Sequence, residues 1–409
     1  MKDPQSAPAW ATVPISELAL LVTKGTTPTS VGFDFVDEGV NFIKVESISS
    51  EGKFLPNKFA KVSCECHDGL RRSQLAEGDI LFSIAGALGR TAAVQNDVLP
   101  ANINQALAII RLKPDVPIDR RFALYALSPS LMLDQIEQQR GGVAQQNLSL
   151  AQVKEFRIPL PPMVEQKRIV TLLDQAFAAL DRARAHAEAN LADSIAVFNT
   201  TLHKIFRRDL AKSTMQFLPD VCTHFGRGKS KHRPRNDPKL YGGEIPFIQT
   251  GDISRAEHLI DSYSQTYSEL GLAQSMLWPK GTVCIAIVGA TIGQTGILGF
   301  DACFPDSVIG IRPDPSVCDP RYVEFMLQAF KDDLKEDGKG SARDNINLET
   351  FKARKFPVPE LSIQMEIVEK LLMAKKISGQ LERIYTQKKR EIANLRQSLL
   401  QKAFSGQLT

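Results

Sequence analysis

Short hydrophobic runs along the chain predict the strands of a mixed sheet. β-rich segments at 80–84, 107–112 and 283–288 are separated by Gly, Pro and Asn, which is typical of strands and their turns. Apolar residues with helical spacing at 122–133 and 322–330 predict helices that pack on such a sheet. The pattern therefore indicates bodies that combine strands and helices.

Two other segments have a different pattern. From 163 to 206, apolar residues recur every three or four positions, charged residues lie between them, and Gly and Pro are absent. The segment 367–399 follows the same pattern, with one Gly at 379. Each segment predicts an amphipathic helix of about 40 residues, or about 60 Å at the rise of an α-helix.

The chain also contains an internal repeat. The segment 142–150, followed by Ile158-Pro-Leu-Pro161, recurs 198 positions later as 340–348, followed by Phe356-Pro-Val-Pro359, and matches continue without a gap to the pair Phe206 and Phe404. Upstream, the halves correspond loosely, at offsets of 203 and 205. Each half therefore has a body in which the offset between the copies varies and a helical tail in which the offset is constant.

A helix of this length needs a partner for its apolar stripe, and the obvious partner is its own copy. We expect an α+β fold with two α/β bodies, joined by two long antiparallel coiled-coil helices with internal pseudo-twofold symmetry. Two separate core helices, each buried in an ordinary domain, are the alternative. The expected divisions are a first body at 13–160, a central helix at 161–207, a linker at 208–214, a second body at 215–358 and a C-terminal helix at 359–405.

The composition narrows the class of protein without identifying a partner. In 409 residues, 43% are hydrophobic and 23% are charged, which excludes collagen-like and disordered chains. The start is polar, and no stretch approaches the roughly 18 apolar residues of a membrane helix, so we expect a soluble, cytoplasmic protein. The net charge of +4 is too small to indicate a polyanionic partner unless the charge is clustered.

The charge is clustered in the second half. The run from Arg227 to Lys239 combines cations with Gly and Pro, which suits a surface loop that approaches a phosphate backbone. Its candidate contacts are Arg227, Lys229, Ser230, Lys231, Arg233 and Arg235. The equivalent place in the first half keeps one cation and two hydroxyls, in Lys24, Thr26 and Thr27. A solvated charge run without a ligand is the alternative.

Polar side chains that address base edges recur near predicted strand ends in both bodies. Lys and Arg bind guanine, Asn and Gln bind adenine, and Glu and Asp accept from the cytosine amino group. The candidates are Lys44, Glu46, Asn102, Asn104, Gln105, Gln145 and Gln146 in the first body, and Gln249, Asp252 and Arg343 in the second. Any one of them alone is more typical of an ordinary surface residue.

Catalytic and metal motifs are missing. A P-loop ending at Gly228-Lys-Ser230 would need Gly at position 223, which is Thr, and no complete GxGxxG, HExxH or GxSxG is present. The six histidines are scattered, and their spacing supports no acid–base pair. We therefore expect a chain without catalytic chemistry and without a bound metal.

The segment Ile158-Pro-Leu-Pro-Pro-Met-Val-Glu-Gln-Lys-Arg-Ile-Val170 resembles the signature of type I restriction–modification specificity subunits, where a target-recognition domain leads into a long helix. The copy at 356–368 keeps the prolines, the Gln and the Ile-Val, but has Ile363 where the motif has Glu. The end of the chain, 399–409, also resembles this family, whereas the first copy departs after Phe206.

This resemblance implies a non-catalytic subunit that binds double-stranded DNA. Each recognition domain would read one half of a bipartite site, while the helices fix the spacing and dock two methyltransferase subunits and, for restriction, two motor-nuclease subunits. S-adenosylmethionine, ATP and Mg would belong to those partners, and this chain would bind no cofactor. The rival hypotheses are a single-chain DNA methyltransferase or nuclease with a divergent site, and a coiled-coil scaffold with no role on DNA.

Overall fold

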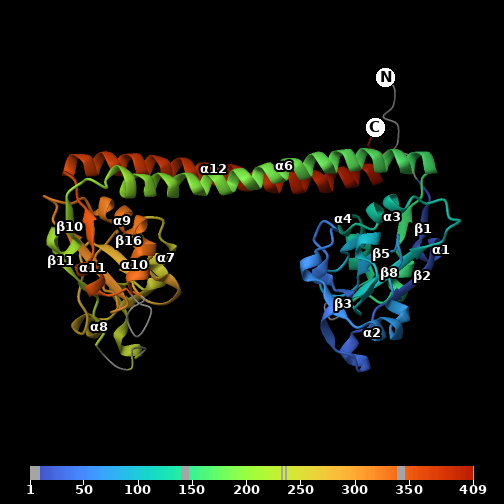
Figure 1. Cartoon of the computed structure of the whole chain (residues 1–409), viewed down its shortest axis with the longest axis horizontal. Helices are drawn as coiled ribbons and strands as arrows, with labels where there is room; N and C mark the ends of the chain where they lie inside the picture. The colour runs from blue at the N-terminus through green and yellow to red at the C-terminus, as the bar shows by residue number, and fades with distance from the viewer. Residues whose placement is uncertain (1–9, 140–146, 232–233, 235–236, 339–345, 409) are drawn as a thin grey trace, which may run out of the picture. The chain divides into compact units, whose positions relative to one another are not determined.

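The computed structural model describes residues 10–139, 147–231, 234, 237–338 and 346–408. The chain divides into two compact units, one made of Met1–Ala187 with Gln387–Thr409 and the other of Glu188–Thr386. Each unit contains one α+β body and portions of two long helices, α6 (Met163–Lys204) and α12 (Leu361–Phe404) (Figure 1).

The first body is built on two sheets. The larger is antiparallel, with the strand order β2-β8-β5-β6, and the smaller has the order β4-β3-β7. A two-stranded ladder of β1 and β9 closes the body where the chain enters α6. The strands are β1 (Thr12–Pro14), β2 (Ala19–Lys24), β3 (Phe35–Ile43), β4 (Ala60–Val62), β5 (Ile80–Ser83), β6 (Thr91–Ala93), β7 (Ala101–Ile103), β8 (Leu107–Leu112) and β9 (Arg157–Pro159).

The helices of the first body are α1 (Ile15–Leu18), α2 (Cys64–Gly69), α3 (Arg120–Ala126), α4 (Pro129–Gln139) and α5 (Leu150–Glu155). The predicted helix at 122–133 is divided between α3 and α4. Pro129 has no backbone N–H and disfavours the helical conformation of Ser128, so one helix ends at Ala126 and the next begins at Pro129.

The second body has the same plan. Its main sheet has the order β11-β17-β15-β16-β13, β12 pairs with β14, and β10 pairs with β18 as β1 does with β9. The strands are β10 (Met215–Phe217), β11 (Cys222–Arg227), β12 (Tyr241–Phe247), β13 (Leu259–Ile260), β14 (Gln265–Tyr267), β15 (Val283–Ala286), β16 (Thr295–Leu298), β17 (Val308–Pro313) and β18 (Lys355–Pro357). The helices are α7 (Thr250–Arg255), α8 (Glu269–Ala273), α9 (Pro320–Ala329), α10 (Lys331–Gly338) and α11 (Leu348–Ala353).

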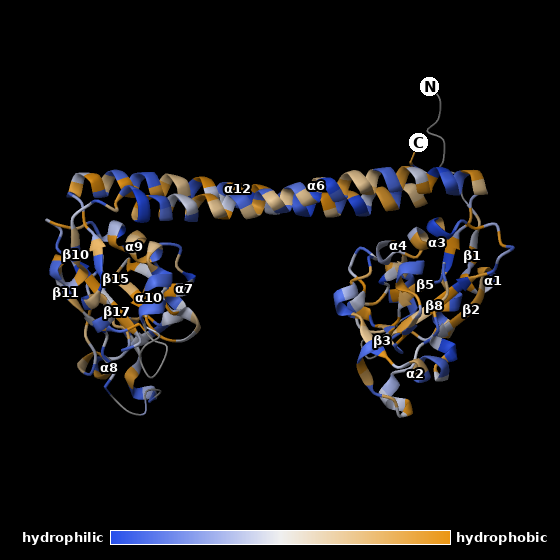
Figure 2. Cartoon of the chain, viewed as in Figure 1, coloured by the Kyte–Doolittle hydropathy of each residue, from blue (hydrophilic) through white to orange (hydrophobic). Residues whose placement is uncertain are grey.

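Hydrophobic residues of the central strands form the core of each body. Every residue of β5 and of β15 is buried, as expected for the middle strands of a sheet that is covered by helices. Figure 2 shows this apolar colouring along β5 and β15, and alternating apolar and polar positions along α6 and α12. The helices covering the sheets contribute large, fully buried rings, including Phe122 on α3 and Phe325 on α9.

The two long helices run antiparallel in the first unit. Arg168 near the start of α6 donates to the Leu408 carbonyl beyond the end of α12 at 2.7 Å, and Asp181 further along α6 pairs with Arg396 at 3.2 Å. The end of α12 also packs on the body, because the rings of Phe404 and Phe122 have centroids 4.9 Å apart.

The second unit repeats this arrangement with the helices exchanged. The π-helical turn that follows α6, Ile205–Asp209, packs on α9, where the rings of Phe206 and Tyr322 have centroids 5.3 Å apart. Between the helices, buried Ser378 donates its hydroxyl to the Ser194 carbonyl at 2.6 Å. Each body therefore packs against the helix that follows it and against the end of the other helix. The fold predicted from the repeat, with two mixed bodies and two long antiparallel helices, is confirmed.

Candidate nucleic-acid interface

A glycine brings the candidate residues of the first body together. A Cβ on Gly25 would lie 1.8 Å from the Ile103 carbonyl oxygen and 2.5 Å from that of Asn104, so only glycine allows the chain after β2 to run against the loop after β7. The Thr27 hydroxyl donates to Oε1 of Gln105 across this contact. Five predicted residues therefore lie along one contact: Lys24, Thr26, Thr27, Asn104 and Gln105.

Lys44 and Glu46 lie beside this contact. Asn104 donates its backbone N–H to the Ile43 carbonyl at 3.2 Å, which holds the end of β3 next to the same loop. Lys44 then precedes the short 3-10 helix η2 (Val45–Ser47) and directs its ammonium over the Phe35 ring, 4.6 Å from the centroid. Glu46 is exposed.

The second body uses a glycine in the same way. A Cβ on Gly228 would lie 2.1 Å from the Phe304 carbonyl oxygen and 2.5 Å from that of Pro305. Arg227, the last residue of β11, precedes this glycine as Lys24 precedes Gly25. The same strand-to-loop approach therefore carries a cation in both bodies.

The basic loop after β11 is held through its backbone. Ser275 donates its hydroxyl to the Lys229 carbonyl at 2.8 Å, and the backbone N–H of Lys231 donates to Oε1 of Gln274 at 2.6 Å. Arg227, Lys229 and Lys231 are exposed. The loop thus combines a fixed backbone with exposed cationic side chains, an arrangement suited to phosphate contacts.

Gln249 occupies the position that Lys44 has in the first body. Gln249 directly precedes α7. The backbone N–H of Ile248 donates to the Cys303 carbonyl at 2.8 Å, and this bond holds the turn next to the segment that Gly228 approaches. The Gln249 side chain donates to that of Gln265, an exposed residue of β14. Sequence reasoning missed Gln265, because nothing in its neighbourhood predicts the pairing of β14 with β12.

Three predicted contact residues have structural roles instead. Asn102 is fully buried, and its amide donates to the Leu70 carbonyl at 3.1 Å and to the Ser73 hydroxyl at 2.9 Å, so the prediction that it contacts a base is wrong. Asp252 is 4% exposed. Its carboxylate accepts the Gln249 backbone N–H at 2.7 Å and pairs with Arg255, so it is occupied within the protein. Ser230 is likewise buried. These residues shape the loops and present no free polar edge.

Five further candidates lie outside the described residues: Gln145, Gln146, Arg233, Arg235 and Arg343. The nearest described residue after the first of these segments is Asn147, which is exposed, and Leu148 donates its backbone N–H to the Ile84 carbonyl at 2.8 Å.

The described part of the chain contains no cluster of three or more His, Cys, Asp and Glu residues able to hold a metal ion. Within it, no helix has the length and apolar character needed to cross a membrane. Buried Glu324 of α9 has its Oε2 2.8 Å from Nδ1 of the partly buried His258, which precedes β13, and it accepts a hydrogen bond from Thr295 at 2.8 Å. This pair is part of the packing of the second body.

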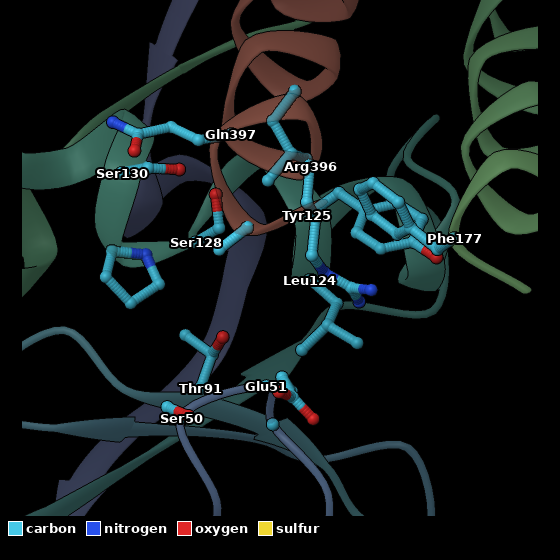
Figure 3. Close-up of a pocket in the computed structure, with 14 residues that line it drawn as sticks. Ser50, Glu51, Thr91, Leu124, Tyr125, Ser128, Ser130, Phe177, Arg396 and Gln397 are labelled. Carbon is cyan, nitrogen blue, oxygen red and sulfur yellow. The ribbon is translucent and has the colours of Figure 1, made fainter. Parts of the chain in front are cut away.

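The first unit has a cavity of about 250 Å³ between its body and the helices. Figure 3 shows Arg396 beside the rings of Tyr125 and Phe177; the guanidinium carbon lies 3.9 Å from the Phe177 centroid. Burial and the Asp174 hydrogen bond raise the pKa of Tyr125 to about 12. The charged residues that line the cavity are paired, Arg396 with Asp181 and Glu51 with Arg184. It is therefore a joint between body and helices, separate from the loops described above.

Comparisons with known proteins agree with the repeat and with the fold. The family model described as the type I restriction modification DNA specificity domain matches twice, at residues 9–188 and 212–388. The chain is 21% identical, over 98% of its own length and 89% of the relative's, to the StySPI specificity subunit of Salmonella potsdam. It is 31% identical to the EcoBI specificity subunit of Escherichia coli over 46% of this chain, a match that spans only 40% of that relative.

Solved structures share the fold over nearly the whole chain. One is a chain of a type I R-M system studied for complex assembly and conformational transition, with a TM-score of 0.78 and 21% identity over 99% of this chain and 100% of that one. Another is the HsdS subunit of Thermoanaerobacter tengcongensis, with a TM-score of 0.62 and 20% identity over 99% of each chain. With two matched specificity domains, the chain belongs to the family of type I restriction–modification specificity subunits, which recognise DNA and are not themselves catalytic.

Proposed function

We propose that each body reads one half of a bipartite site in double-stranded DNA. The observation that carries this proposal is the arrangement shared by Gly25 and Gly228, where a strand ends in a cation and the loop after it packs closely against a second loop. The two bodies share this backbone but differ in side chains, with Asn104 and Gln105 in one and Pro305 and Asp306 in the other. Different side chains on one scaffold suit two different half-sites.

Phosphate contacts in this proposal come from Lys24 in the first body and from Arg227, Lys229 and Lys231 in the second. Base contacts come from the exposed polar residues beside them, including Gln105 and Gln249. The bodies at 13–160 and 215–358 act as the recognition domains, and the segments 161–207 and 359–405 set the spacing between half-sites. Half-sites read on one face of B-DNA lie about 34 Å apart, so the spacing requires rigid connecting elements.

The partners we propose are DNA, two methyltransferase subunits and, where the system restricts, two motor-nuclease subunits, all meeting in the cytoplasm. S-adenosylmethionine, ATP and Mg serve those partners. The helices α6 and α12 offer exposed apolar side chains for docking, including Val164, Met365 and Met373. Purified chain given methyl donor and DNA should then transfer no methyl groups, and transfer without a partner would contradict the proposal.

The decisive experiment exchanges one body. Cells that carry the complete system are compared with cells in which residues 215–358 come from another family member, and both methylomes are sequenced. We expect an asymmetric bipartite motif in which the exchange alters one half only. A change in both halves, or in neither, contradicts the assignment of one half-site to each body.

The basic loop is tested with Lys229→Ala combined with Lys231→Ala. If both side chains contact phosphates, binding weakens for all DNA sequences alike. The slope of the logarithm of the binding constant against the logarithm of salt concentration then falls in magnitude by up to about two. Lys113→Ala is the matched control, because Lys113 is an exposed lysine just beyond the end of β8 that lies opposite the loop at 104–106; no change in slope is expected. An unchanged salt dependence in the double variant would remove this loop from the interface.

A further inference from the structure

One buried glutamine at the start of each long helix ties the helix to its body. Gln166 is fully buried; its amide nitrogen donates to the Pro161 carbonyl at 2.8 Å and to the Pro117 carbonyl at 2.9 Å. Its side-chain oxygen accepts the backbone N–H of Asp119 at 2.8 Å. One amide therefore joins α6, the segment that leads into it, and the segment that leads into α3.

The second unit contains the same contacts. Gln364 donates to the Pro359 carbonyl at 2.8 Å and to the Val317 carbonyl at 2.9 Å, and it accepts the backbone N–H of Asp319 at 3.0 Å. Gln364 is also fully buried. We call each set of three hydrogen bonds a glutamine clamp.

Only a primary amide satisfies this geometry. Two carbonyls require two N–H donors and the Asp N–H requires an acceptor, and among uncharged side chains of this length only Gln supplies both. A glutamate would face two carbonyls without a proton to donate, and a methionine would fill the space without any hydrogen bond.

The clamp acts on the helix that orients the body. Asp119 and Asp319 are the N-caps of α3 and α9, and their carboxylates accept the first free N–H groups of those helices. Because α3 and α9 pack on the sheets through buried rings such as Phe122 and Phe325, the direction of each cap relative to the long helix fixes the direction of the body.

We propose that Gln166 and Gln364 are positioning residues that select the length of the non-specific spacer between the half-sites, an inference that rests on the proposed function. A body of about 150 residues is about 38 Å across, so a tilt of about 5° at the joint moves its far edge by about 3.4 Å, one base-pair step. The half-site sequences are read by the loops around Gly25 and Gly228, which the clamp does not touch, and stay the same when it is lost.

The test uses the complete complex with its methyltransferase partners. Gln166→Met and Gln364→Met keep the side-chain volume and remove the hydrogen bonds, while Lys167→Ala and Glu366→Ala change exposed neighbours on the same helices. Binding is measured to duplexes that carry the two half-sites with the native spacer or with one base pair added or removed, and methylomes are sequenced in parallel.

For the wild type and the controls we expect discrimination of at least about tenfold against the altered spacers, and for the Met variants less than about threefold with unchanged half-sites. Unchanged discrimination in a folded Met variant overturns the proposal. Loss of folded chain in both Met variants also overturns it, because the glutamines then serve stability alone. A wild type that shows no bipartite motif refutes instead the proposed function, so the two failures are distinguishable.

Discussion

The side-chain carbonyl of Gln364 accepts the backbone N–H of Asp319 at 3.0 Å, and 198 positions earlier Gln166 accepts that of Asp119 at 2.8 Å. The same interaction is therefore present in both units. The matched network explains why the repeat tolerates no insertion here, since a shift of one residue along the helix would turn the amide away from its three partners.

Removing this amide should destabilise the protein. Gln364→Ala removes the partner of the Asp319 N–H and of the Val317 and Pro359 carbonyls, which are partly buried, and this costs about 1–3 kcal/mol in the free energy of unfolding. Lys167→Ala, at an exposed position, should change it by less than about 0.5 kcal/mol. Urea unfolding followed by circular dichroism measures both. Equal midpoints for Gln364→Ala and wild type would contradict the importance of these hydrogen bonds for stability.

Asp319 should make stability depend on pH in the acid range. Burial by itself raises the pKa of Asp319, but hydrogen bonds from the Arg321 side chain and from backbone N–H groups outweigh it, and the pKa is lowered below the ordinary 3.8. A lowered pKa favours the charged form in the folded state, so its contribution is present above pH 3.8 and is lost as the pH falls through the folded pKa.

Asp319→Asn tests this dependence, because asparagine caps a helix but does not titrate. The variant should be less stable than the wild type at neutral pH, and the difference should shrink as the pH falls below about 3.8. Urea midpoints between pH 7 and pH 3 measure it. A difference that stays constant over this range would rule out the charge of Asp319 as the cause.

Gly228 should be intolerant of alanine, unlike its neighbour Gly226. A Cβ at Gly228 collides with the Phe304 carbonyl oxygen at 2.1 Å, whereas a Cβ at Gly226 meets nothing within 4 Å. Gly228→Ala therefore has to displace the basic loop, and we expect DNA binding to weaken by at least about tenfold, with Gly226→Ala close to wild type. Equal binding by the two variants would show that the loop position does not matter for DNA.

Asn102 and Gln105 should have opposite effects, although both are polar residues of one short segment. Asn102→Ala removes two buried hydrogen bonds and should lower the free energy of unfolding by about 1–3 kcal/mol without changing the recognised sequence. Gln105→Ala, at an exposed residue, should leave stability within about 0.5 kcal/mol and alter the first half-site. Thermal melts and methylome sequencing separate the two effects, and the reverse pattern would contradict both assignments.

Arg396 should stabilise the joint of the first unit through stacking on an aromatic ring as well as through its charge. Its guanidinium pairs with Asp181 at 3.2 Å and stacks on Phe177 at 3.9 Å. Arg396→Ala should lower the free energy of unfolding by about 1–2 kcal/mol, and Arg396→Lys by less, because lysine keeps the charge but loses the planar stacking. High salt should remove only part of the Arg396→Ala effect. Complete loss of the effect in salt would show that the ion pair acts alone.

How far the sequence anticipates the fold depends on the range of the interactions that decide each element. The strand predicted at 107–112 is β8, and the helix predicted over 163–206 is present as α6 to Lys204. Both could be predicted because the spacing of apolar residues within a short segment indicates the type of element. The break at Pro129 is local too, but the apolar spacing on both sides concealed it.

The candidate site is less accessible to sequence reasoning. Asn102 and Asn104 are two positions apart and equally polar, yet one is buried against Leu70 and Ser73 and the other lies in the loop that Gly25 approaches. Nothing near Gln265 in the sequence places it beside Gln249. In each case the deciding contacts come from residues outside the local sequence.

The sequence by itself determined the repeat, the two long helices, the kind of body and the family, because periodicity and motif spacing are properties of neighbouring residues. Only the tertiary structure decided which polar residues face solvent and which satisfy the core. A buried amide such as Gln166 or Asn102 is stable only where distant backbone groups converge on it, and that convergence is set by packing.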